Sequence, residues 1–170
     1  MPRRGTDLRR LRRECAAALA DLRLPDRADL AALCEHLSQV RGRPLQVVPV
    51  AMHAEQPCGM WVATRDRDWV FVDADTTAAH QEHIVLHEIA HMICEHDGGD
   101  HDAASLFPDI DPGLVRAMLA RTTYSDEQEQ QAEVMAYLLA ETLRSPSAGA
   151  DDLPSRIAES LNHAGRRGKR

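Results

Sequence analysis

The chain has 170 residues, of which 44% are hydrophobic and 28% are charged, and its formal net charge is −7 at pH 7. This composition is that of a globular protein with enough residues for one domain and its core, and it excludes a disordered chain of high net charge. The negative net charge argues against a protein whose main function is to bind nucleic acid through its phosphates. No apolar run is long enough for a signal-peptide core or a membrane span, so we expect a cytoplasmic protein without a membrane partner.

The first forty residues predict two helices. Apolar side chains recur at helical spacing between residues 6 and 23, with arginines on the opposite face, and Pro25 follows this helix. A second helix is expected from about Asp26 to Val40, where the sequence RGRP interrupts it. No nucleic-acid recognition motif accompanies the arginines of residues 3–13 and 166–170, so we interpret them as solvated charges and expect no direct binding of nucleic acid.

The middle of the chain changes to the pattern of short strands. The stretches LQVVPVAM, MWVAT and DWVFVD, between residues 45 and 73, are rich in valine and aromatic residues and are separated by polar or Gly/Pro turns. We predict three strands, with the last two joined as a hairpin across residues 65–68. A helix then follows over residues 77–96, with Asp75, Thr76 or Thr77 as its N-cap and the DGG of residues 97–99 at its end.

A last long helix is predicted over residues 126–143, where Ser125 or Asp126 can serve as the N-cap. Its apolar stripe consists of Ala132, Met135, Ala136, Leu139 and Leu143. Beyond this helix the sequence becomes linker-like and ends in a basic tail. We therefore expect a single domain over residues 1–144, followed by a linker and tail over residues 145–170.

Within the helix over residues 77–96, His87, Glu88 and His91 spell the motif H-E-x-x-H. Two histidines four residues apart lie on one face about one turn apart, so both imidazoles can reach a single divalent ion. The glutamate between them is offset to where it can take a proton from a water molecule beside the ion. Imidazole ligands suit Zn²⁺, and a catalytic zinc site has three protein ligands. We therefore interpret His87 and His91 as zinc ligands and Glu88 as the general base.

The same stretch carries further histidines. His83, His87 and His91 form one column, but the outer two are eight residues apart, or about 12 Å along a helix, and cannot share one ion. The pair of His83 and His87 is the alternative, yet Ile84 follows His83 and cannot act as a base. The remaining histidines are expected on the surface, at a helix cap or against a metal ligand: His80, His83 and His96.

A third ligand has to come from another element, and the helix over residues 126–143 offers four glutamates. At about 100° per residue, Glu129 lies nearer the centre of the apolar stripe than Glu133 does, while Glu127 and Glu141 lie farther away. We take Glu129 as the third ligand. Glu133, one turn on, is expected to orient a histidine, or to be the ligand itself if the helix presents a different face.

Together these residues resemble the ImmA/IrrE family of zinc metallopeptidases, and especially its short actinobacterial members. The likeness covers residues 7–143 and rests on LPDRADLAALCEHLSQVRGRPL, PCGMWVATRDRDWVFVD, HQEHIVLHEIAHMICEH and YSDEQEQQAEVMAYLLA, the last of which looks like the E-x-x-A helix of the family. The resemblance assigns His87 and His91 as metal ligands, Glu88 as the base and Glu129 as the third ligand.

The resemblance implies an α+β fold of the gluzincin or zincin-like kind, in which a small antiparallel or mixed sheet packs on the active-site helix and the glutamate-bearing helix. An edge strand around Met60 to Thr64 would pair with an extended peptide. The implied function is a zinc endopeptidase that cuts, or otherwise inactivates, a helix-turn-helix repressor and so releases genes for stress response or mobile-element transfer. Gln131 and Met135 stand where the family often has glutamate and phenylalanine or leucine, and neither change touches the proposed metal.

A function from another class is also compatible with these residues, namely a non-catalytic zinc-binding module that sequesters a regulator through the same groove. The intact motif favours an enzyme, since a structural zinc site has no need of Glu88 and usually closes its fourth position with protein. Three residues are open candidates for stabilising an oxyanion, although none is assigned as catalytic: Tyr124, His96 and Arg121. Cys58 could approach the metal as a thiolate from the loop before the edge strand.

Overall fold

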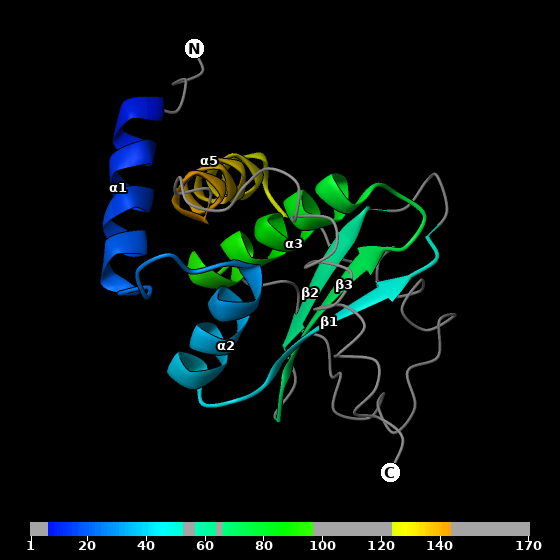
Figure 1. The fold of residues 1–170 in the computed structure, drawn as a ribbon. Coiled ribbons are helices and arrows are strands. Elements are labelled where there is room, and N and C mark those ends of the chain that lie inside the picture. Colours follow the sequence, from blue (N-terminus) through cyan, green and yellow to red (C-terminus); the bar gives the residue numbers. More distant parts are fainter. Residues whose placement is uncertain (1–6, 53–56, 64–65, 97–123, 144–170) are drawn as a thin grey trace.

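The computed structural model describes residues 7–52, 57–63, 66–96 and 124–143. These residues form four helices and a small mixed sheet of three strands, so the predicted α+β class is confirmed. Figure 1 shows how the helices and the sheet are arranged. The predicted linker and tail of residues 145–170 lie outside the described part of the chain. No helix within the described ranges is long and apolar enough to cross a membrane.

The strands are β1 (Leu45–Val50), β2 (Gly59–Ala63) and β3 (Asp68–Asp73). Their order in the sheet is β1-β3-β2, with β1 parallel and β2 antiparallel to β3, so the predicted pairing of the last two strands is confirmed. Val70 and Val72 pack into one cluster and Trp69 and Phe71 into another, because the central strand β3 is buried on both faces. In the part of the sheet that the structure describes, β2 has a neighbouring strand on one side only.

Helix α2 spans Leu30–Arg41 and packs against β1. It begins four residues after the predicted start at Asp26. The start is delayed because Arg27 takes a left-handed backbone conformation with φ of 60°, and because the side chain of Asp29 caps the first turn. At the other end Gly42, with φ of 66°, closes the helix where the sequence RGRP predicted its end.

A buried carboxylate ties α2 to the sheet. Asp68 is inaccessible to solvent and accepts hydrogen bonds from the guanidinium groups of Arg41 at 2.6 Å and Arg43 at 2.9 Å. It also accepts one from the indole N–H of Trp61 at 3.1 Å. Four N–H donors, three of them from the two guanidinium groups, compensate for the removal of this charge from water. Through Trp61 the same carboxylate anchors the edge strand β2.

Helices α3 (Ala78–Ile93) and α5 (Asp126–Leu143) carry the H-E-x-x-H motif and the glutamates. Thr77 caps α3, and it is one of the three residues predicted for this role. At the start of α5, the Ser125 hydroxyl accepts a hydrogen bond from the Gln128 N–H, and the Gln128 side chain accepts one from the Ser125 N–H. This reciprocal capping box explains why α5 begins where the sequence predicted.

The end of α3 differs from the prediction, since the helix stops at Ile93 rather than at residue 96. Cys94 caps it, and Glu95 takes a left-handed conformation with φ of 55°, which costs a residue with a side chain about 1–2 kcal/mol. The His96 N–H then donates to the carbonyl of His91 at 3.0 Å. The chain therefore folds back over the last turn and places His96 off the helix.

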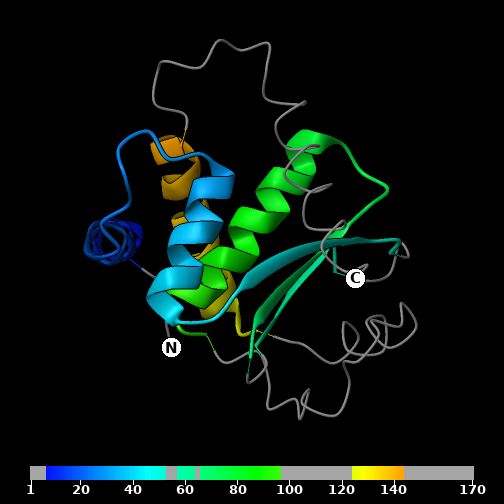
Figure 2. The ribbon, with the colours of Figure 1, turned by 60° about the horizontal axis from the view of Figure 1, so that its bottom comes forward.

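Helix α3 lies between the sheet and α5, and α1 (Leu8–Asp21) packs on α5 at the far side of the molecule (Figures 1 and 2). One apolar core joins these layers and contains Ile84, Val85, Ile89, Met135, Leu139, Val70 and Val72. Burial of this surface on both flanks holds α3 in a single orientation. Its polar motif residues therefore face the junction with α5 and β2.

Candidate metal centre

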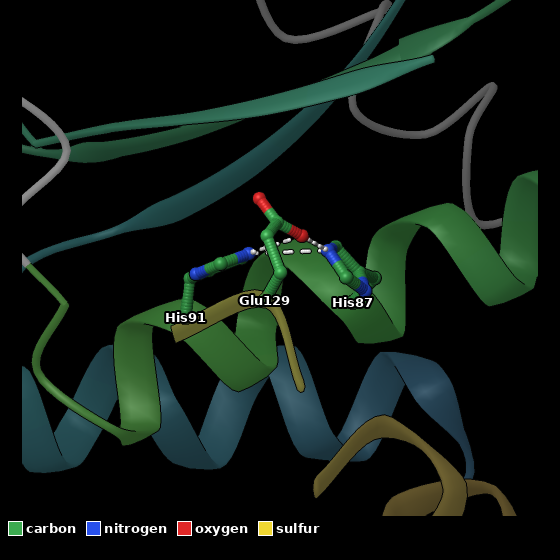
Figure 3. Close-up of side chains that lie close together, drawn as sticks. All are labelled: His87, His91 and Glu129. Carbon is green, nitrogen blue, oxygen red and sulfur yellow. Dashed lines mark hydrogen bonds and ion pairs between the residues drawn. The ribbon is translucent and has the colours of Figure 1, made fainter. Parts of the chain in front are cut away.

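Helix α3 directs His87 and His91 to the same point. Their Nε2 atoms lie 3.1 Å apart. Figure 3 shows the two rings pointing toward each other. The spacing of four residues accounts for this convergence, because it stacks the two side chains on one face of the helix. His91 is fully buried, whereas about a fifth of the His87 side chain is exposed, so the point of convergence lies at the protein surface.

Glu129 reaches the same point from the first turn of α5 (Figure 3). One of its carboxylate oxygens lies 3.1 Å from Nε2 of His87 and 3.7 Å from Nε2 of His91. The ligand atoms of these three residues lie within 4.8 Å of one another and could hold a metal ion. Packing of α3 against α5 thus brings together the three residues that the sequence analysis proposed as ligands.

Glu133 lies one turn along α5 and contacts the opposite side of the His87 ring. Its carboxylate is 3.4 Å from Nδ1 of His87 and 3.7 Å from Nε2 of His83. A carboxylate at Nδ1 favours a proton on that nitrogen and leaves the Nε2 lone pair directed at the ligand group. Glu133 is not a member of the ligand group of the described residues, and its role in orienting His87 stays a prediction.

The environment of His91 keeps its imidazole neutral. Burial, followed by the positive charges that His87 and His96 can carry, lowers the pKa of His91 to about 3. The ring of Tyr124 stacks on it, with centroids 3.6 Å apart and planes inclined by 14°. A neutral imidazole is the form that binds metal ions, so no proton has to be displaced from His91 near neutral pH.

Glu88 belongs to α3, and its side chain lies between this helix and the edge strand β2. Its side chain is buried and accepts a hydrogen bond from the backbone N–H of Trp61 at 2.9 Å. Burial raises the pKa of Glu88 to about 8, the Trp61 N–H acts in the opposite direction, and the charge of Glu129 adds to the rise. Glycine at position 59 permits this approach, because a Cβ there would lie 2.3 Å from Cγ2 of Ile84.

A pocket of about 340 Å³ opens over these residues. On one side it is lined by the start of β2 and the residues before it, including Cys58 and Met60, and on the others by α3, Tyr124 and the glutamates of α5. Tyr124 has a buried hydroxyl that has no hydrogen-bond partner among the described residues. The pocket thus exposes a possible metal-binding point next to a buried carboxyl group and a tyrosine.

The remaining candidates lie around this centre. His83 is exposed, and His80 contacts the hydroxyl of Thr76 at 2.8 Å near the start of α3, so neither belongs to the ligand group of the described residues. Cys58 is exposed and lines the pocket, but it is not a member of that group either. Arg121 lies outside the described residues.

Sequence reasoning missed two contacts of the centre. Trp61 holds Glu88 through a backbone N–H, which no side-chain pattern marks. Gln131 accepts a hydrogen bond from His96, which in turn contacts His91. The prediction of a helix up to residue 96 concealed this second contact, because it placed His96 on the helix instead of in the turn that follows.

Comparisons of the chain with protein-family models, with curated proteins and with solved structures found no match.

Proposed function

We propose that the protein is a zinc-dependent endopeptidase of the ImmA/IrrE type that makes a specific cut in a helix-turn-helix repressor. The observation that carries the proposal is the convergence of His87, His91 and Glu129 beside the buried carboxyl group of Glu88. Two imidazoles and one carboxylate are the ligand set of many zinc hydrolases, and the neighbouring carboxyl group supplies the base that such chemistry needs.

The distances between the three ligand atoms fit zinc. Bonds from zinc to nitrogen and oxygen are about 2.0–2.2 Å long, so neighbouring corners of a tetrahedral site lie about 3.3–3.6 Å apart. The separations of 3.1, 3.1 and 3.7 Å are close to these values. With protons on the Nδ1 atoms of His87 and His91, the lone pairs of both Nε2 atoms and of the Glu129 carboxylate point at one place. These lone pairs repel one another unless a cation lies between them.

Zinc bound there would polarise a peptide carbonyl and lower the pKa of a water molecule. Glu88 accepts the proton of the attacking water and later donates it to the leaving amine. A cation bound beside Glu88 would favour its carboxylate form, which is the form that accepts a proton. The Trp61 N–H holds the carboxyl group in place. Tyr124 lines the same pocket, and its buried hydroxyl, which has no hydrogen-bond partner among the described residues, is a candidate donor to the carbonyl oxygen of a substrate.

The edge strand supports a peptide as the substrate. Trp61 directs its N–H away from β3 and toward Glu88, and backbone groups of alternate residues face the same way, so those of Gly59 and Ala63 also face the open edge. An extended peptide can pair with such an edge by main-chain hydrogen bonds. Its scissile bond would then lie over α3. The choice of a repressor as the protein substrate follows from the family resemblance.

The test uses purified zinc-loaded protein, a helix-turn-helix regulator from the same source and mapping of new termini by mass spectrometry. We expect one cut with the wild type, and a loss of at least about 10²-fold in rate with Glu88→Gln at unchanged zinc content. If Glu88→Gln relieves repression as well as the wild type does, the protein is a binding module and not a peptidase.

A further inference from the structure

A chain of hydrogen bonds leads from the metal centre into the protein. Nδ1 of His91 lies 2.9 Å from Nδ1 of His96, and Nε2 of His96 lies 3.0 Å from Oε1 of Gln131. His91 and His96 are both buried, so these contacts are shielded from water. The chain starts at the ring nitrogen of His91 that faces away from the ligand group.

The direction of each hydrogen bond follows from the acceptor at its end. An amide oxygen can only accept, so the Nε2 atom of His96 carries a proton and donates it to Gln131. A neutral imidazole with a proton on Nε2 has a bare Nδ1, which can only accept. The facing Nδ1 of His91 therefore carries a proton and donates it to His96. His91 is left with a bare Nε2, and this atom faces His87 and Glu129.

We infer that His96 and Gln131 are positioning residues, which hold His91 in the one tautomer that can bind a metal ion. The inference rests on the metal centre of the proposed function but not on peptide cleavage. If the amide of Gln131 were turned to present its nitrogen, every proton in the chain would shift and the Nε2 atom of His91 would carry a hydrogen. A His91 ring with a hydrogen on Nε2 cannot bind a metal ion through that atom. Metal binding therefore requires the observed orientation of the Gln131 amide, and a bound metal ion favours that orientation in turn.

The two positioning residues come from the same helices as the ligands. His96 follows the turn at the end of α3, and Gln131 lies on α5, two residues after Glu129. The left-handed conformation of Glu95 is what brings His96 back to His91. The backbone cost of that turn is consistent with a role for His96 at the centre, because strained conformations persist where the surroundings favour them.

The test compares Gln131→Met, which keeps the length of the side chain but removes the acceptor, with Gln130→Met as the matched control. Gln130 is the preceding glutamine of α5 and makes no hydrogen bond to His91 or His96 within the described residues. Zinc affinity is measured by competition with a chelator. We expect Gln131→Met to weaken binding about tenfold or more and Gln130→Met to leave it within about twofold.

The second readout is the tautomer of each imidazole in the metal-free protein, from long-range ¹H–¹⁵N correlation spectra at neutral pH. The wild type should show His91 with its proton on Nδ1 and His96 with its proton on Nε2. In Gln131→Met both rings should become mixtures of tautomers. The spectrum of His96→Phe identifies the signals of His96, because it lacks them. The same change removes the hydrogen-bond acceptor of His91, so it should weaken zinc binding at least as much as Gln131→Met does.

A proton on Nε2 of His91 in the wild type, or unchanged tautomers and zinc affinity in Gln131→Met, would overturn the inference. Neither measurement uses a peptide substrate. A protein that shows the expected tautomers and zinc affinities but cuts no regulator would contradict the proposed function alone. If His96→Phe does not fold, Gln131→Met alone tests the inference. Gln131 is a half-buried residue of α5.

Discussion

Glu88 shows how the position of one residue changes its chemistry. The same side chain on a solvated helix would have a pKa near 4.5, whereas burial between α3 and β2 raises the pKa to about 8. The Trp61 N–H opposes this rise but does not cancel it. Folding of the metal-free protein therefore favours the protonated form of Glu88.

This shift predicts a pH dependence of stability in the metal-free protein. The unfolded chain releases the Glu88 proton near pH 4.5, and the folded chain keeps it up to about pH 8. Its contribution to the free energy of unfolding is therefore complete below pH 4.5 and is lost as the pH rises to 8. Relative to Glu88→Gln, the wild type should lose up to a few kcal/mol across this window, as measured by urea denaturation in the presence of a chelator.

The comparison with Glu88→Gln also removes the effect of His91. The folded-state pKa of His91, about 3, lies below its ordinary value of 6.5, so its contribution is lost as the pH falls through that range, which is the opposite sign. Both proteins share this contribution, and it cancels in the difference. If the two stability curves stay parallel from pH 4.5 to 8, burial does not shift the pKa of Glu88 as described.

At the scale of elements, the close approach of β2 to α3 shapes the site. Gly59 lies against Ile84 and Glu88, and no side chain fits between them. The same strand supplies the Trp61 N–H to Glu88, and Asp68 holds the Trp61 indole from the other end. The distance between strand and helix therefore controls whether Glu88 has its hydrogen-bond donor.

We predict that Gly59→Ala separates the two elements. A Cβ at this position would lie 2.3 Å from Cγ2 of Ile84 and 3.0 Å from Oε1 of Glu88, so either β2 or α3 has to move. The expected loss of stability is about 1–3 kcal/mol, which urea denaturation of the metal-free protein measures. In the double variant Gly59→Ala/Ile84→Ala the two losses should be less than additive, because the second change removes the nearest obstacle. Strict additivity would show that the glycine is not needed for close packing.

The second element-scale feature is the turn after α3, which sequence patterns did not reveal. Glycine or asparagine is the usual signal for a left-handed residue at the end of a helix, but here glutamate 95 has that conformation. The glycines of the DGG segment follow only later in the sequence. A prediction based on local signals therefore extends the helix to residue 96 and places His96 on the helix, not in the turn that follows it.

At the scale of the whole molecule, the proposed metal would link two of the layers. Its ligands come from α3 and α5, and these helices share one core with the sheet. An ion that binds only when the two helices are packed stabilises the entire fold by mass action. Metal binding and global stability should therefore change together.

Zinc at about 100 times its dissociation constant should add about 2.7 kcal/mol of stability. For a chain of this length the Tm would rise by about 5–10 °C, which differential scanning calorimetry with and without a chelator can measure. Glu129→Gln should remove most of this rise, since its carboxylate faces the Nε2 atoms. Glu127→Gln is the matched control on the same helix and should keep most of it, because Glu127 is not a member of the ligand group of the described residues. Equal losses in both variants would contradict the assignment of Glu129 as the ligand.

The sequence by itself determined the features that depend on spacing along one element. Periodicity predicted the helices and strands, the interval between His87 and His91 placed both rings on one face, and the helical phase favoured Glu129 over Glu133. These relations are local, because the geometry of a helix converts sequence distance directly into direction. These relations predict which residues converge, but not which groups surround those residues.

Only the tertiary structure decided how the centre is supported. The Trp61 N–H at Glu88, the His96 contact at His91 and the amide of Gln131 join residues that are up to 35 positions apart in the chain. Such contacts depend on how the sheet, α3 and α5 pack, and on where α3 stops. Packing reflects the burial of many side chains at once, so no short stretch of sequence contains it.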